Sequence, residues 1–148
     1  MTEKELSEII FNGNYEINNE NNACIEILTY GLENKKLLYV DYKGEENQEI
    51  VNYILDYEFE NGLELASEEE LEYLEDFDYM ELPEKIKEVN KIIEEKSYGL
   101  FSYPTFGDFY ALFLAKLDYK IELLKNEICI KESDERIPVE EKKIQYYY

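Results

Sequence analysis

The stretch between Lys43 and Lys85 contains no lysine or arginine, and this gap constrains the fold more than any other feature of the sequence. Its 41 residues carry sixteen acidic side chains. Residues 44–84 therefore supply −16 of the formal net charge of −21, and the other 107 residues supply only −5. Helices formed here must turn their carboxylates toward solvent, because neighbouring like charges repel each other.

The composition is that of a folded domain. The chain has 148 residues, and 45% of them are hydrophobic, which excludes a disordered acidic tail. The longest apolar run, 109–115, is far shorter than the roughly 20 residues that cross a bilayer. The first ten residues lack the basic start and apolar core of a signal peptide.

The first part of the chain is expected to contain two helices and a strand. Thr2 and Glu5 have the spacing of a capping box, which predicts a short helix ending near Phe11. A second helix is expected over 23–33. The apolar run 36–42 predicts a strand that is buried on both faces near its middle.

The acidic stretch is expected to form two helices. The first covers about 45–60. The second begins at another capping box, made by Ser67 and Glu70, and ends at Phe77 or Met80. When each helix is projected at about 100° per residue, an apolar side and a carboxylate side separate.

The rest of the chain predicts a helix, a hairpin and a second helix. Pro83 suits the first turn of a helix over about 83–96. Two apolar strands around a Pro/Gly turn predict a hairpin over about 98–116. The expected elements that follow are a helix over 117–127 with Leu117, Ile121 and Leu124 facing inward and an optional edge strand over 128–131.

Together these elements predict an α+β fold. We expect a single domain over 1–131, with helices packed on a small, mainly antiparallel sheet whose central hairpin covers about 98–116. Residues 132–148 are expected to form a loosely ordered C-terminal tail. The sequence leaves open whether Ile144–Tyr148 is ordered.

The carboxylate sides of the two acidic helices are the candidate binding surface. Aromatic residues beside them could act as anchors, because aromatic residues are enriched at interface hot spots. Phe59 and Tyr73 are expected to be core residues instead. The candidate partner-binding residues are Glu45, Glu49, Asp56, Glu60, Glu68, Glu72, Glu75, Asp76, Tyr53, Tyr57 and Tyr79.

The chemistry of this surface selects a basic partner. A field of one sign speeds encounter with an opposite charge, and it repels nucleic acid and gives no reason to expect a membrane. A protein with a basic, nucleic-acid-binding groove could accept the carboxylates in place of phosphates. The alternative is that the stripes are only solvated helix faces, as most charge runs are.

Nothing in the sequence indicates catalysis or a cofactor. The chain has no histidine and no glycine-rich phosphate loop. A calcium loop beginning at Asp56 fails, because Asn61 stands where glycine is required. Asp41, on the expected buried strand, is the one catalytic candidate, and a hydrogen-bonded structural role is commoner for such a residue. We therefore expect no enzyme, no metal and no cofactor.

The two cysteines, Cys24 and Cys129, are isolated and lack the spacing of a redox or metal motif. Reduced thiols and a cytoplasmic location are the default expectation. A disulfide between them is the alternative.

Three segments resemble an uncharacterised family of small acidic bacterial domains. They are Asp41-Tyr42-Lys43 after a strand, Tyr98-Gly99-Leu100, and the strand from Asp108 to Leu114. The similarity covers about two-thirds of the chain, and this sequence departs from it at the turn 104–108 and in having no tryptophan. The family is similar to proteins found beside bacterial toxins, so the resemblance implies immunity and supplies no catalytic residues.

Three functional hypotheses follow. The first is an acidic inhibitor, an immunity protein that occludes a basic, nuclease-type toxin. The second is a phage-encoded nucleic-acid mimic, such as an anti-CRISPR or anti-restriction protein, which blocks a defence nuclease. The third is a housekeeping adaptor without an anionic mechanism, or a small enzyme that uses Asp41. The sequence does not specify the oligomeric state.

Overall fold

The computed structural model describes residues 2–13, 15–18, 23–105, 107–125 and 143–148. Their helices are α1 (Glu3–Phe11), α2 (Ala23–Glu33), α3 (Glu49–Asn61), α4 (Glu68–Glu75), α5 (Leu82–Ile93) and α6 (Lys120–Lys125), with the 3₁₀ turns η2 (Glu94–Lys96) and η3 (Leu117–Tyr119). Their strands are β1 (Leu38–Asp41), β2 (Tyr98–Tyr103), β3 (Phe109–Lys116) and β4 (Gln145–Tyr146). The expected α+β fold is confirmed.

The four strands form one antiparallel sheet in the order β1-β3-β2-β4. Its centre is the hairpin of β2 and β3, whose register runs from Tyr98 opposite Lys116 to Tyr103 opposite Ala111. The hairpin predicted from the two apolar runs is therefore confirmed, with its strand bounds. Both of its strands contribute side chains to the hydrophobic cores on the two faces of the sheet, which explains why they are mostly apolar.

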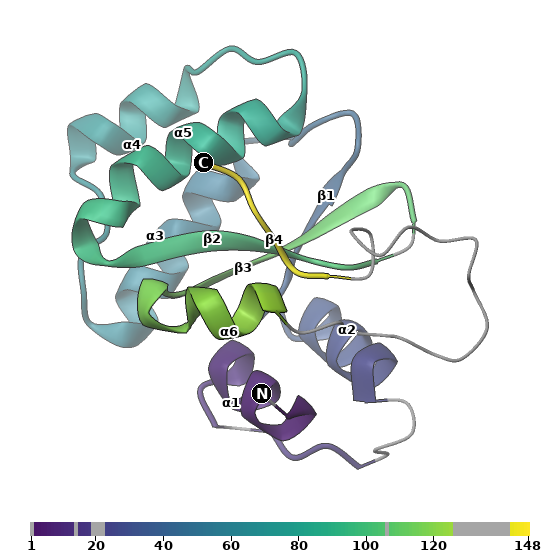
Figure 1. The fold of residues 1–148 in the computed structure, drawn as a ribbon. Helices are drawn as coiled ribbons and strands as arrows, with labels where there is room; N and C mark the ends of the chain where they lie inside the picture. The colour runs from purple at the N-terminus through teal and green to yellow at the C-terminus, as the bar shows by residue number, and fades with distance from the viewer. Residues whose placement is uncertain (1, 14, 19–22, 106, 126–142) are drawn as a thin grey trace.

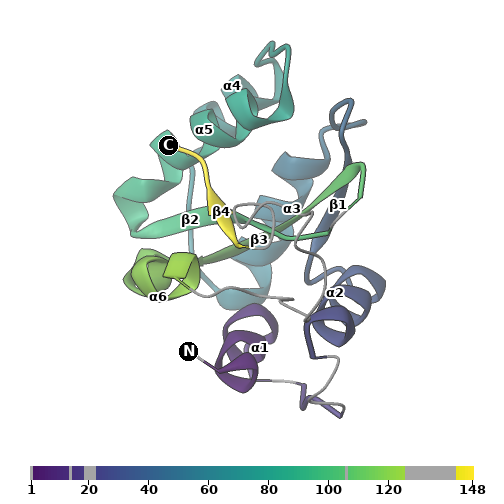
Figure 2. The same ribbon diagram turned by 45° about the vertical axis from the view of Figure 1, so that its right-hand side comes forward.

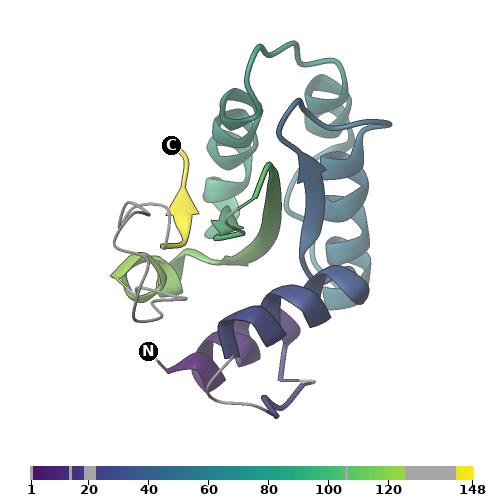
Figure 3. The ribbon, with the colours of Figure 1, turned by 90° about the vertical axis from the view of Figure 1, so that its right-hand side faces the viewer.

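Helices cover both faces of this sheet (Figure 1). The views in Figures 2 and 3 agree that α4 and α5 lie on one side and α1 and α2 on the other. Successive side chains of a strand point to opposite faces, so β3 contributes residues to two hydrophobic cores. Leu112 and Leu114 pack with α3, α4 and α5, whereas Phe113 and Ala115 pack with α1, α2 and α6.

The strand predicted over 36–42 is the edge strand β1, and the prediction that its middle is buried on both faces was wrong. Val40 is fully buried on one face, but Tyr39 is 51% exposed and Asp41 is exposed. The sheet order explains the difference, because β1 pairs only with β3. An apolar run does not reveal whether its strand lies at the centre or at the edge of a sheet.

Helix α3 begins at Glu49, four residues later than predicted. Asn47 and Gln48 have φ values of 52° and 61°, which lie in the left-handed region and cannot continue a right-handed helix. Asparagine tolerates this region better than most residues, so the turn has a local cause. Glu45, which we placed on the first acidic helix, therefore lies in the turn before it.

The helix expected over 117–127 begins as the 3₁₀ turn η3 and becomes α-helical at Lys120. Leu117 and Leu124 are half-buried and pack on the core, as expected. Ile121, also expected to face inward, is 68% exposed, and Leu123 is buried, because the change of pitch rotates the following side chains. The strand suggested over 128–131 lies outside the described residues.

The last residues of the chain are ordered against the sheet. β4 adds a strand to β2, with Phe101 opposite Tyr146 and Ser102 opposite Gln145. A Cβ atom at residue 99 would lie 2.6 Å from the Tyr146 ring, so Gly99 provides the space for that ring. The Lys120 ammonium lies 4.4 Å from the Tyr146 ring centroid and 4.6 Å from that of Tyr148.

Cys24 differs from the expectation that the cysteines are reduced thiols. This residue, near the start of α2, is disulfide-bonded, whereas the sequence favoured reduced thiols. Cys129, the other cysteine of the chain, lies outside the described residues.

Asn90 connects α5, β2 and the C-terminal segment. Its side-chain oxygen accepts a hydrogen bond from the Leu100 N–H at 2.7 Å. Its amide donates to the Leu100 carbonyl at 3.3 Å and to the Tyr147 carbonyl at 2.7 Å. The side chain is almost fully buried, so these bonds have no water to replace them.

We expect Asn90→Ala to lower the free energy of unfolding by about 1–3 kcal/mol, because it leaves buried backbone groups without partners. Urea unfolding measures this loss. Asn52→Ala is the matched control, since Asn52 is exposed and its replacement should change stability by less than about 0.5 kcal/mol. Equal losses in the two variants would contradict the assigned role of Asn90.

Candidate functional site

The first acid of the base-free stretch and the first base after it form a buried ion pair. Glu45 Oε1 contacts the Lys85 ammonium, and the two side chains are only 5% and 2% exposed. Glu45 Oε2 accepts a hydrogen bond from the Ile50 N–H at 2.8 Å, which satisfies a backbone donor in the first turn of α3. Glu45 was predicted to bind a partner, but its carboxylate is used inside the protein.

Tyr79 belongs to the same internal cluster. Its hydroxyl oxygen accepts a hydrogen bond from the Glu45 N–H at 3.0 Å, and its ring lies 5.7 Å from the Lys85 ammonium. Burial raises the pKa of Tyr79 above its ordinary value. Tyr79 therefore stabilises the turn before α3, and its side chain has little surface left for a partner.

Two further acids of the stretch accept hydrogen bonds from backbone N–H groups. Glu58 accepts hydrogen bonds from the N–H groups of Leu65 and Ala66, at 2.6 and 3.2 Å, and so fixes the connection between α3 and α4. Glu70 and Ser67 form the predicted capping box at the start of α4, with both reciprocal bonds present. These carboxylates are used for local structure.

The remaining acids of α3 lie along a groove. A cavity of about 550 Å³ separates α3 from the segment 34–39, and Glu49, Asp56 and Glu60 are among its lining residues. Glu60 pairs with Lys36 at 3.4 Å, and Glu49 accepts a hydrogen bond from the Glu46 N–H at 3.1 Å. The structure therefore brings five predicted site residues to one groove, the three acids and the tyrosines Tyr53 and Tyr57, and Lys36 already offsets part of the acidic charge.

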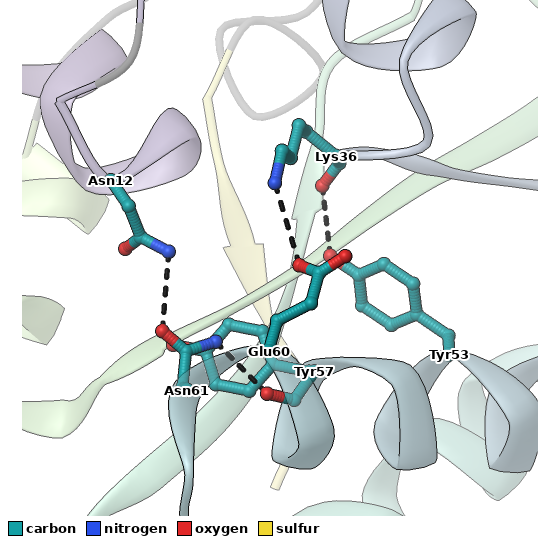
Figure 4. A network of polar contacts seen from close by, with 6 residues as sticks. All are labelled: Asn12, Lys36, Tyr53, Tyr57, Glu60 and Asn61. Atoms are coloured by element: carbon teal, nitrogen blue, oxygen red, sulfur yellow. Dashed lines mark hydrogen bonds and ion pairs between the residues drawn. The ribbon is translucent and has the colours of Figure 1, made fainter.

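Figure 4 shows a network of polar contacts around α3. The Asn12 amide donates to the Asn61 side chain at 3.3 Å, and the Asn61 amide donates to the Tyr57 carbonyl at 2.9 Å. The contacts link the end of α1 with the end of α3. The residues drawn are Asn12, Lys36, Tyr53, Tyr57, Glu60 and Asn61.

Tyr53 and Tyr57 point toward the interior from α3. The Tyr53 hydroxyl donates to the Lys36 carbonyl at 2.8 Å, and the Tyr57 ring packs edge-to-face on Tyr98. Burial is the main cause that raises the pKa of both phenols. Both side chains are partly buried and also line the groove, so their predicted role as anchors for a partner stays a prediction.

The acids of α4 face solvent. Glu68, Glu72 and Asp76 are exposed and Glu75 is half-buried. Within the described residues none of the four makes an ion pair. Leu71 and Leu74 occupy the opposite side of the helix and are buried, as the periodicity predicted.

Two aromatic residues that we expected in the core lie on the surface. Phe59 is 90% exposed, and Tyr73 is 49% exposed and donates a hydrogen bond to Glu88 at 2.9 Å. On α3, positions 50, 51 and 54 fill the core, which leaves position 59 on the outer side. At 100° per residue, position 59 lies on the opposite side of the helix from position 50, so the spacing indicated an exposed residue. The apolar character of phenylalanine led us to expect it in the core.

The structure gives no support to a catalytic role for Asp41. Its exposed carboxylate accepts a hydrogen bond from the Lys43 N–H at 2.9 Å, a contact typical of a turn. Among the described residues no group of three or more acids or cysteines is arranged to hold a metal ion. In the same part of the chain, no helix has the length and apolarity needed to span a bilayer.

No family model, no curated protein and no solved structure matches the chain. The resemblance to toxin-neighbouring acidic domains therefore stays a hypothesis.

We expect Glu45→Gln and Lys85→Met each to lower the free energy of unfolding by about 3–5 kcal/mol, because each leaves one buried charge unpaired. The double variant should lose less than the sum of the two, since it contains no unpaired charge and the introduced glutamine keeps an acceptor for the Ile50 N–H. Urea unfolding of all four proteins gives the coupling energy. Additive losses would contradict the buried pair.

We expect stability at alkaline pH to depend on Tyr53. Because its pKa is raised in the folded protein, Tyr53 releases its proton more easily when the chain unfolds. Its contribution is complete below the ordinary tyrosine pKa of about 10 and declines as the pH rises above that value. Tyr53→Phe should therefore lose less stability than the wild type between pH 9 and 11 in urea unfolding; equal losses would contradict the assignment.

Proposed function

We propose that this protein is an inhibitor of a basic protein, acting as an immunity protein that binds and occludes a nuclease-type toxin. The acidic side of α4 makes the electrostatic contact, through Glu68, Glu72 and Asp76. The proposed site has fewer residues than the sequence indicated, because the side chains of Glu45, Tyr53, Tyr57 and Tyr79 make contacts within the protein.

The observation that carries this proposal is the unbalanced charge of α4. Among the described residues, two ion pairs lie near the surface, Glu60 with Lys36 and Glu88 with Lys91, and many other exposed acids make none. α4 differs in the density of such acids, because Glu68, Glu69 and Glu72 are all exposed within eight residues. On α4 the exposed acids have no such neighbour within the described residues. Like charges one helical turn apart cost about 0.2–0.5 kcal/mol per pair, and a nearby lysine would remove that cost. A positively charged partner would remove it too.

The mechanism follows from the charge distribution. Carboxylates fixed on a rigid helix attract a basic groove from a distance and orient it before contact. Complementary potentials increase the association rate and specificity more than the affinity. The same groove would otherwise hold phosphates, so occupying it prevents the toxin from binding nucleic acid.

The cytoplasmic location expected from the sequence stays a prediction. The disulfide at Cys24 is a reason to test it, because disulfides persist mainly in oxidising compartments.

We expect the triple variant Glu68→Gln, Glu72→Gln, Asp76→Asn to bind its basic partner more weakly. Exposed ion pairs contribute about 0.2–1 kcal/mol each, so the dissociation constant should rise roughly 3- to 100-fold. Proteins of the source cell are bound to the immobilised chain at about 0.05 M salt. They are eluted at about 0.5 M salt, where charge screening is strong. Each released basic protein is then tested for nuclease activity with and without the chain.

The matched control is Glu33→Gln, Glu94→Gln, Glu95→Gln, which removes the same charge from exposed positions outside α4. It should retain and inhibit the nuclease as the wild type does. Full inhibition by the α4 variant would contradict the proposal. Competition with added DNA or RNA would assign the contact to the substrate groove, as expected for either an occluding immunity protein or a nucleic-acid mimic.

A further inference from the structure

The outer side of α3 carries an apolar patch that the fold does not use. Leu55 and Phe59 lie one helical turn apart and are 44% and 90% exposed. The half-buried Leu63 follows just after the helix ends. These side chains line a shallow, open depression, together with Glu58, Gly62 and Glu64. We call Leu55, Phe59 and Leu63 the α3 patch.

Phe59 gains almost nothing from folding. A phenylalanine is among the side chains most stabilised by burial, and this one keeps nearly all of its surface in water. Single exposed apolar residues are ordinary, but here two large ones are adjacent and border a depression. An aromatic side chain in that setting is suited to anchor an interface.

The rim of the α3 patch determines what can cover it. Glu58 and Glu64 line the depression, and no basic residue does. The exposed Asp56 lies nearby on the same helix, whereas Glu60 is already paired with Lys36. A second copy of this chain would bring two acidic rims together, and like charges across an interface are strongly unfavourable. A partner with basic residues around an apolar pocket would be complementary in both charge and polarity.

We propose that the α3 patch is the apolar anchor of the interface with that basic protein partner, with Phe59 entering an apolar pocket framed by lysine or arginine side chains. This inference rests on the proposed function and adds a contact that charge alone does not provide. Exposed acids mainly control association and its salt dependence, whereas a desolvated aromatic anchor mainly controls dissociation.

The test uses two synthetic peptides of equal length and equal positive charge. One alternates lysine with leucine, and the other alternates lysine with serine. Isothermal titration of the full chain at about 0.05 M salt measures both affinities, and the difference between them isolates the apolar contribution. We expect the lysine–leucine peptide to bind about tenfold more tightly, and Phe59→Ala to remove that difference.

The control is Ile121→Ala, which removes an apolar side chain that is 68% exposed on α6, outside the patch. It should leave both affinities unchanged. Phe59→Tyr should keep most of the difference, because the ring remains. Since Phe59 is exposed, none of these variants should unfold the protein, and urea unfolding verifies that.

The outcomes separate this inference from the proposed function. If both peptides bind equally and salt releases them, the acidic attraction stands and the α3 patch is not an anchor. If neither peptide binds, the proposed function and the inference are both overturned. If sedimentation shows a wild-type dimer and a Phe59→Ala monomer, a second copy covers the patch and the inference is overturned.

Discussion

The buried ion pair between Glu45 and Lys85 fixes the two ends of the acidic stretch 44–84 to each other. The two residues enclose the base-free stretch, so their contact joins its beginning to the residue that follows its end. Between them the chain forms α3, α4 and the first turn of α5, which pack on one face of the sheet. Tyr79 and the Ile50 N–H complete the polar contacts of the pair. Burying two charges is tolerable only with such partners.

Acidic residues that look alike in the sequence have different uses in the structure. Glu45, Glu58 and Glu70 bind backbone N–H groups and are unavailable to a partner. Glu68 and Glu72 leave their carboxylates in solvent, without a basic neighbour among the described residues. The net charge thus overstates the number of acids that are free of internal contacts, and the surface that we propose for binding is smaller than two full stripes.

The proposed interface would combine two contributions that act at different stages of binding. The carboxylates of α4 act over a distance and are weakened by salt. An apolar anchor such as Phe59 acts only on contact and is insensitive to salt. Phe59 lies near the end of α3 and is exposed, because Ile50, Val51 and Ile54 form the side of this helix that packs in the core.

Elements whose signals are local could be predicted from the amino-acid sequence: the capping box at Ser67, the hairpin over 98–116, the bounds of α2 and the apolar side of α4. Each depends on neighbouring residues, through backbone capping, alternation or helical periodicity. Three other features became visible only in the folded protein: β1 is an edge strand, Lys85 neutralises Glu45, and Phe59 lies on the surface. These outcomes depend on contacts between residues far apart in the chain, and composition and spacing do not record which distant residues meet.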